Sequence, residues 1–284
     1  MSLPVVTQTG WSAAEEARAA RADGRSKAFI PTGLREALPA ALGLAVLLSA
    51  WEGWVRLRHV KPYLVPAPSR VVARLARDPD LFFREGFHTL EGAILGFVLG
   101  AAIAVSLAAL MSQSRFLERA IFPLAILVKV TPIIAVAPLL AIWFGFGLFP
   151  KVFIAALVVF FPVMVNALVG FRSVSPSALS LFESLAARRG EVFLKLQVPS
   201  SLPYLFAAFR LAIPLSVIGA VVAEWFSGDR GLGRVIYVAN SNLDMATAFA
   251  GIFALAIIGI SLYLVSTALE KKLLFWHESV LESR

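Results

Sequence analysis

The chain contains no cysteine and few charged residues, and both absences restrict what it can be. Without cysteine, neither a disulfide framework nor a thiolate metal site is possible. Charged residues make up 15% of the 284 residues, against about a quarter in a soluble domain, while hydrophobic residues make up 59%. The mean hydropathy is +0.81. We therefore expect most of the chain to be surrounded by lipid.

Histidine is scarce and the basic residues are scattered, which excludes further classes of function. His59, His88 and His277 lie far apart in the sequence without ligand spacing, so no metal site is expected. No cluster of His, Asp and Glu marks a catalytic site, so a membrane enzyme is not expected. The net charge of +8 is spread over tails and loops and forms no single stripe, which argues against a nucleic-acid partner.

Long apolar runs predict an all-α membrane protein with about six transmembrane helices, because about 20 residues cross the ~30 Å hydrocarbon layer. Prolines and charges between the first two runs predict an extramembrane loop with a short amphipathic piece. Polar tails are expected at residues 1–37 and 270–284. The predicted spans are residues 38–55, 88–112, 120–143, 150–171, 202–226 and 246–269.

Two local patterns within these spans predict how the helices are built. Gly92, Gly96 and Gly100 repeat at a spacing of four, which lets two helix backbones approach closely and predicts a packing face. Thr131 and Pro132 interrupt the third apolar run, and proline breaks or kinks a helix. We therefore expect a broken helix near Pro132.

The segment from 176 to 198 predicts an amphipathic helix outside the bilayer, between the fourth and fifth spans. Leu181, Leu185, Val192 and Leu196 fall near helical spacing, and charged residues occupy the positions between them. The segment resembles the cytoplasmic coupling loop of ABC importer permeases, whose pattern is an EAA triplet, a Gly three residues later and an I-x-L-P ending.

Parts of this segment match the pattern and other parts depart from it. Leu196, Val198 and Pro199 match the ending, whereas Ala186 stands where the Gly is expected. Ser180 occupies the place of the usual Glu. Glu183 lies one helical turn later, and whether it substitutes for that Glu stays open.

Four further stretches are similar to the nitrate/sulfonate/taurine-type permease family, a resemblance that covers about residues 40–277. They are VPAPSRV at 65–71, TPIIAVAPLLAIWFGFG at 131–147, FFPVMVNALVGFRSV at 160–174 and AEWFSGDRGLG at 223–233. The resemblance implies the type I permease fold of ABC importers and a multi-pass position in the bacterial inner membrane, with both termini cytoplasmic. The positive-inside bias is weak by itself.

The same resemblance implies the partners. A second permease copy or a paralogue would pair with this chain, a cytoplasmic ABC ATPase dimer would grip the coupling helix, and an extracytoplasmic binding protein would deliver the solute. The chain has no G-x-x-x-x-G-K-[ST] phosphate loop, so no catalytic residue and no cofactor are expected in it and a separate subunit would use ATP. The residues implied in ATPase coupling are Ser180, Glu183, Leu185, Ala186, Arg188, Arg189, Leu196 and Pro199.

Polar residues inside the spans are candidates for the translocation path: Thr131, Pro132, Asn166, Ser216 and Glu224. Interhelical hydrogen bonding explains Thr131 and Asn166 equally well. An interfacial carboxylate paired with Arg230 or Arg234 is the alternative for Glu224. Lys129 either lines the cavity or reaches the headgroups, and for Arg210 a structural role is preferred.

The rival class is an ion-coupled secondary transporter, which would show paired repeats and intramembrane acids rather than one docking segment. The substrate remains open between two chemistries of the family. The stretch from Ser184 to Phe206, with Ala in place of Gly, favours the branch that transports pyrimidine thiamine precursors or riboflavin. Aliphatic sulfonates, nitrate and taurine are the alternative.

Overall fold

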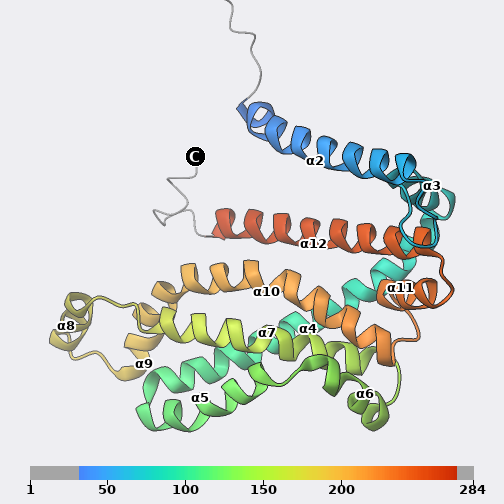
Figure 1. Ribbon diagram of the computed structural model, residues 1–284. Coiled ribbons are helices and arrows are strands. Elements are labelled where there is room, and N and C mark those ends of the chain that lie inside the picture. The colour runs from blue at the N-terminus through green and yellow to red at the C-terminus, as the bar shows by residue number, and fades with distance from the viewer. Residues whose placement is uncertain (1–31, 274–284) are drawn as a thin grey trace, which may run out of the picture. The chain divides into compact units, whose positions relative to one another are not determined.

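The computed structural model describes residues 32–273, within which every regular element is a helix (Figure 1). The expected tails therefore fall largely outside the described residues. The chain divides into two units, Met1–Trp51 and Glu52–Arg284, and each is described by itself. Helix α2 (Thr32–Leu57) begins in the first unit and ends in the second.

The second unit contains the remaining elements and all of the candidate sites. In chain order they are α3 (Pro68–Arg77), α4 (Pro79–Gln113), α5 (Arg115–Val130), α6 (Ile133–Phe144), α7 (Leu148–Phe171), α8 (Pro176–Ser184), α9 (Arg189–Val192), the π-helix η1 (Phe193–Gln197), α10 (Val198–Ser227), α11 (Leu232–Ser241) and α12 (Met245–Leu273).

Five helices in the described residues are long and apolar enough to cross a membrane, and α5 with α6 makes a sixth if the bent pair is one span. The axes of α5 and α6 differ by 94° across the break at Thr131 and Pro132. This is the all-α fold of about six spans that the apolar runs predict. Helix α4 begins at Pro79, nine residues before the expected span, and proline is tolerated at this first helical position.

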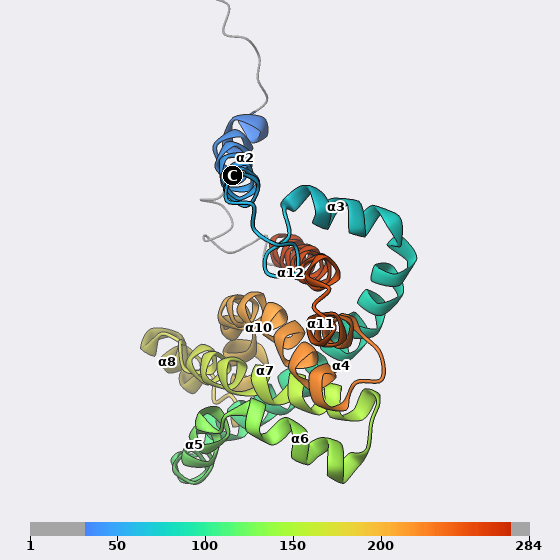
Figure 2. The same ribbon diagram turned by 45° about the vertical axis from the view of Figure 1, so that its right-hand side comes forward.

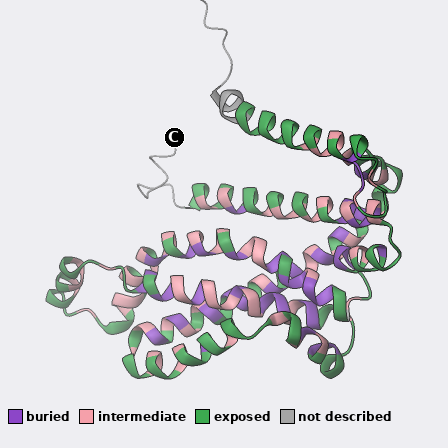
Figure 3. Cartoon of the chain, in the orientation of Figure 1, coloured by how far each residue is buried: buried purple, intermediate pink, exposed green. Residues whose placement is uncertain are grey.

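The core of the second unit lies among α4, α7 and α10, which run side by side (Figures 1 and 2). Figure 3 shows the buried residues concentrated on these three helices. Small side chains dominate the core, which brings the helices close together. Its buried members include Ala101, Ala104, Ala108, Met111, Val159, Val163, Met164, Ala167, Ala208 and Ala212.

The glycine stripe of α4 packs directly against the backbone of α7. A Cβ atom on Gly96 would lie 2.8 Å from the Val152 carbonyl oxygen, and one on Gly100 would lie 2.6 Å from that of Ala156. Both distances are shorter than a carbon and an oxygen tolerate. The packing face that the glycine spacing predicts is therefore the contact of α4 with α7.

Replacing Gly100 by Ala is expected to lower the free energy of unfolding by about 1–3 kcal/mol, because the methyl group must push α4 and α7 apart. The measurement is the thermal unfolding midpoint of the detergent-purified protein. Gly259→Ala in α12 is the matched control, since nothing lies within 4 Å of its Cβ position. Equal midpoints for the two variants would refute the close packing.

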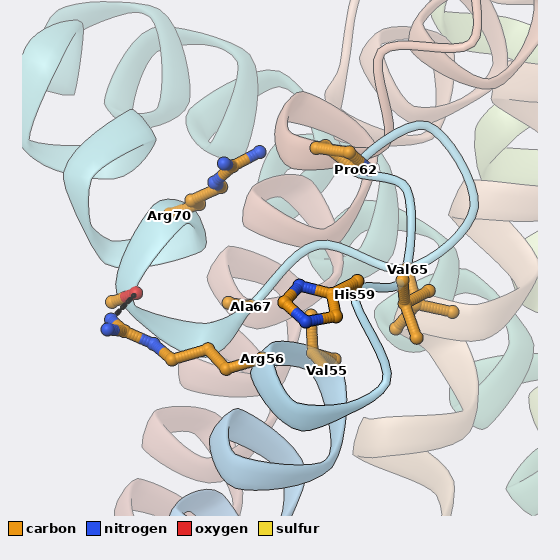
Figure 4. A pocket seen from close by; sticks show the side chains of 9 residues that line it. Val55, Arg56, His59, Pro62, Val65, Ala67 and Arg70 are labelled. Carbon is orange, nitrogen blue, oxygen red and sulfur yellow. Dashed lines mark hydrogen bonds between the residues drawn. The ribbon is translucent and has the colours of Figure 1, made fainter.

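The end of α2 is joined to α3 through the carboxylate of Glu52. This carboxylate accepts hydrogen bonds from the Ser69 backbone N–H (2.9 Å) and hydroxyl (2.8 Å), and from Arg56 Nε (2.6 Å). It thereby satisfies a free N–H in the first turn of α3. Beside this junction lies a cavity of about 480 Å³, and Figure 4 shows side chains that line it, with the Arg56 guanidinium directed away from His59. Arg56 Nη2 donates a hydrogen bond to the Ser69 hydroxyl at 3.5 Å.

Candidate functional site

The loop of residues 173–200 projects from one end of the helices and joins α7 to α10 (Figure 1). The prediction of one continuous helix over 176–198 is wrong. The structure has three consecutive pieces, α8, α9 and η1, with a break from Leu185 to Arg188. Ser175 begins α8 by accepting a hydrogen bond from the Ala178 N–H, and the Glu191 side chain begins α9 by accepting one from the Arg188 N–H.

The break is caused by the backbone conformation of Ala186, whose φ is +53°. Its N–H donates to the Glu183 carbonyl at 2.9 Å, which closes the last turn of α8. The left-handed conformation costs a residue with a Cβ atom about 1–2 kcal/mol and suits glycine. The position at which the coupling pattern expects Gly is thus the position at which the backbone favours Gly.

Replacing Ala186 by Gly is expected to stabilise this turn by about 0.5–1 kcal/mol, because glycine removes the strain of the left-handed conformation. Amide hydrogen exchange of residues 183–188 should slow by about two- to fivefold. Ala187→Gly is the control, since Ala187 does not have a positive φ. Equal or faster exchange in the Ala186 variant would contradict the assignment of strain.

Three leucines of this loop are exposed: Leu181 by 58%, Leu185 by 69% and Leu194 by 67%. Ser180, Glu183, Ala186, Arg188, Arg189 and Pro199 are exposed as well, and Leu196 is half-buried. The Ser180 hydroxyl donates to the Pro176 carbonyl within α8. The loop therefore presents apolar side chains beside arginines, as a protein-binding surface does.

A cavity of about 670 Å³ lies between the α5–α6 bend and α7. It brings together Thr131, Pro132 and Asn166 of the predicted path, and Lys129 also lines it. The Thr131 hydroxyl donates to the Leu127 carbonyl (2.7 Å), and Asn166 Nδ2 donates to the Pro162 carbonyl (2.8 Å). Lys129 Nζ lies 4.6 Å from the centre of the Phe161 ring. The remaining lining is apolar.

Ser216 and Glu224 do not line this cavity. The Ser216 hydroxyl is buried and donates to the Ile213 carbonyl at 2.7 Å, so its hydrogen bond is made within helix α10. Arg210 forms an ion pair with Glu270 at 3.4 Å, as its preferred structural role implies.

Glu224 is completely buried and pairs with Lys151 of α7, which is 3% exposed. The distance from Lys151 Nζ to Glu224 Oε1 is 3.5 Å. The expected alternative of a pair with Arg230 or Arg234 is therefore wrong. Arg230 contributes only its backbone carbonyl, which accepts a hydrogen bond from Lys151 at 2.5 Å. The reason is that the packing of α7 against α10 brings the Lys151 amine next to the Glu224 carboxylate.

This ion pair belongs to a polar cluster that fixes the start of α11. Glu224 Oε2 accepts hydrogen bonds from the Gly233 N–H (2.7 Å) and the Thr89 hydroxyl (3.0 Å). Thr89 in turn accepts one from the Leu232 N–H (2.8 Å), and Glu85 accepts one from the Gly231 N–H (2.7 Å). Three consecutive N–H groups of the turn are thus bound by side chains of α4 and α10.

The cluster also explains the glycines of this turn. Gly231 has a φ of +116°, and a Cβ atom at Gly233 would lie 2.8 Å from Glu224 Oε2. Lys151, Thr89 and Glu85 of this cluster are not among the residues predicted from the sequence. The charge of Lys151 directly after Pro150, at the start of an apolar run, was the one signal for a buried partner.

At the opposite end, Arg172 is held by Glu118 of α5. Arg172 Nη1 and Nη2 donate to the two carboxylate oxygens at 2.9 and 2.7 Å, and Nη2 also donates to the Met111 carbonyl at 3.1 Å. The hydrogen bonds to Glu118 raise the pKa of the Arg172 guanidinium. Within the described residues, no group of three His, Asp or Glu side chains can hold a metal ion.

Comparison with known proteins relates this arrangement to transport. The family described as binding-protein-dependent transport system inner membrane component matches residues 96–275. The chain is 34% identical to the formylaminopyrimidine transport permease protein ThiX of Halalkalibacterium halodurans over 244 residues, 86% of this chain and 97% of that protein.

Two further relatives carry other substrate names. The riboflavin transport system permease protein RibX of Chloroflexus aurantiacus is 34% identical over 245 residues, 84% of this chain and 91% of that protein. The taurine transport system permease protein TauC of Escherichia coli is 29% identical over 244 residues, 84% of this chain and 89% of that protein.

Proposed function

Because the chain belongs to the inner membrane components of binding-protein-dependent transport systems, and is thus an ABC importer permease, we propose that its loop of residues 173–200 docks an ATPase subunit. The exposure of Leu181, Leu185 and Leu194 on an extramembrane loop is the observation that carries the proposal. The loop joins α7 to α10, so a partner that displaces it moves two core helices. Family membership decides against the secondary transporter.

In this proposal the exposed leucines and the turn at Ala186 enter a groove on the ATPase, and Arg188 and Arg189 meet its rim. The ATPase hydrolyses ATP, whereas this chain supplies the path. The remaining members of the proposed coupling set are Ser180, Glu183, Leu196 and Pro199.

The proposal places the loop and both termini in the cytoplasm, and cysteine labelling tests this orientation. Since the chain has no cysteine, Ser184→Cys and Ser241→Cys each create a single thiol on an exposed residue. In cells whose outer membrane has been permeabilised, a membrane-impermeant maleimide is expected to label position 241 and to spare position 184 until the inner membrane is opened. The reverse pattern would overturn the proposed docking.

We further propose that the cavity at the α5–α6 bend is part of the translocation path, with Lys129, Thr131 and Asn166 as its polar groups. Its mostly apolar lining suits a flat heterocycle that carries a few hydrogen-bonding groups. The names of two relatives, for formylaminopyrimidine and riboflavin, support a pyrimidine thiamine precursor or riboflavin as the substrate. Sulfonate, nitrate or taurine is the alternative, which the taurine relative supports.

Binding to the cognate solute-binding protein tests the substrate. Titration calorimetry with a formylaminopyrimidine and with riboflavin is expected to show tight binding of one of them. Tight binding of taurine, an alkane sulfonate or nitrate, with no affinity for either heterocycle, would reject the preferred class.

The path requires a second permease, because the cavity is bordered by exposed apolar side chains of α5 and α6 such as Leu127 and Ile134. We propose a second copy of this chain in that place. The mass of the purified assembly is expected to show two copies per two ATPases. A mass that corresponds to one copy of this chain and one related permease would contradict the homodimer and indicate a heterodimer.

A further inference from the structure

A pocket of about 510 Å³ lies at the end of the helices that carries the 173–200 loop. Its lining consists of Arg115, Glu118, Arg119, Phe122, Pro123 and Arg172, and these six residues are called the arginine pocket. Three guanidinium groups face one carboxylate there, which leaves two positive charges uncompensated. The proposed transport path and ATPase loop use none of these residues.

The arginine pocket is held in shape by the pair of Arg172 and Glu118 described above. Arg115 and Arg119 are four residues apart, so they lie on the same face of α5, and both are exposed. No hydrogen bond or ion pair engages either of their guanidinium groups within the described residues. The structure thus fixes one arginine and leaves two free beside it.

Two helices that are long enough to span a membrane, α4 and α7, end beside the pocket at Gln113 and Phe171, and α5 begins there. We therefore expect the pocket to lie at the level of a membrane interface. Gln113 Nε2 donates to Gln197 Oε1 at 2.8 Å, which places this end beside the extramembrane loop. The residues that continue α5 into the membrane are apolar and exposed, including Leu124 at 61%. Phe116, 79% exposed, stands next to Arg115.

We propose that the arginine pocket binds the headgroup phosphate of an anionic phospholipid in the leaflet on the side of the 173–200 loop. Guanidinium groups form paired, charge-assisted hydrogen bonds with phosphate oxygens. Basic pockets between helix ends on one side of a membrane suit anionic headgroups. A free phosphate would leave the adjacent Phe116 and Leu124 unused, whereas the acyl chains of a lipid cover them.

The test compares lipids on the full-length chain purified in detergent, with whatever subunits copurify. Phosphatidylglycerol is expected to raise the thermal unfolding midpoint, and phosphatidylcholine is not. Arg115→Gln together with Arg119→Gln should weaken the apparent affinity for phosphatidylglycerol by about 30-fold, because each arginine near an anionic surface contributes about fivefold. Arg58→Gln with Arg77→Gln removes two exposed charges elsewhere and should leave the affinity unchanged.

Three outcomes would overturn the lipid site. The first is equal stabilisation by the two lipids. The second is an equal loss of affinity in both double variants, which would indicate surface charge in general. The third is full stabilisation by millimolar inorganic phosphate alone, which would make the ligand a free anion. Native mass spectrometry provides an independent count, with phosphatidylglycerol expected on the wild type and absent from the Arg115 and Arg119 variant.

Discussion

Replacing Glu224 by Ala is expected to destabilise the protein by about 3–5 kcal/mol. The variant leaves the Lys151 ammonium buried without a counter-charge. It also removes the acceptor of the Gly233 N–H and the Thr89 hydroxyl, which holds the start of α11. The measurement is the unfolding midpoint in detergent, together with the amount of protein in the membrane.

A double-mutant cycle separates the ion pair from the volume of the side chains. Lys151→Met alone should destabilise by a similar amount, because the Glu224 carboxylate is then buried alone. Combining it with Glu224→Gln should recover at least half of that loss, since a neutral amide still accepts hydrogen bonds from Gly233 and Thr89. Additive losses in the double variant would show that the two side chains act independently.

Replacing Leu185 by Asp is expected to abolish coupling while the protein still inserts into the membrane. If Leu185 enters an ATPase groove as proposed, the carboxylate must be desolvated there, at a cost on the order of several kcal/mol. Substrate-stimulated ATP hydrolysis and uptake should therefore fall by about tenfold or more. Leu185 is 69% exposed in this chain, so folding should be unaffected. The same change at Ala186 should act in the same direction.

Leu64→Asp is the matched control, because Leu64 is 58% exposed and also lies outside the helices. Its effect on ATP hydrolysis is expected to stay within about twofold of wild type. The assay uses the purified transporter in proteoliposomes with its binding protein. Full substrate-stimulated hydrolysis in the Leu185 variant would remove the loop from the ATPase contact.

Apolar runs predicted the class of fold and the number of spans, because lipid requires about 20 apolar residues for each crossing. The glycine stripe predicted a packing face, since spacing along one helix determines which residues share a side. Gly96 and Gly100 pack on α7 as this reasoning requires. Both features are local in sequence, and local patterns can be read without knowledge of partners.

The break after α8 and the partner of Glu224 could not be predicted in the same way. Helical spacing continues on both sides of the break, so periodicity does not reveal the left-handed residue Ala186 between them. Lys151 lies 73 positions before Glu224, and only the packing of α7 against α10 brings their side chains together. Thr89 joins them from a third helix.

The 38 residues from Arg189 to Phe226 form a nearly unbroken helical run through α9, η1 and α10. At 1.5 Å per residue this run is up to about 57 Å long. In the proposed docking, the ATPase contacts the start of this run, and Glu224 lies near its other end. A tilt of the run by about 5° would move that end by about 5 Å, nearly one helical turn. Pro203 and Pro214 lie inside α10, so a bend of the helix at either residue would reduce this displacement.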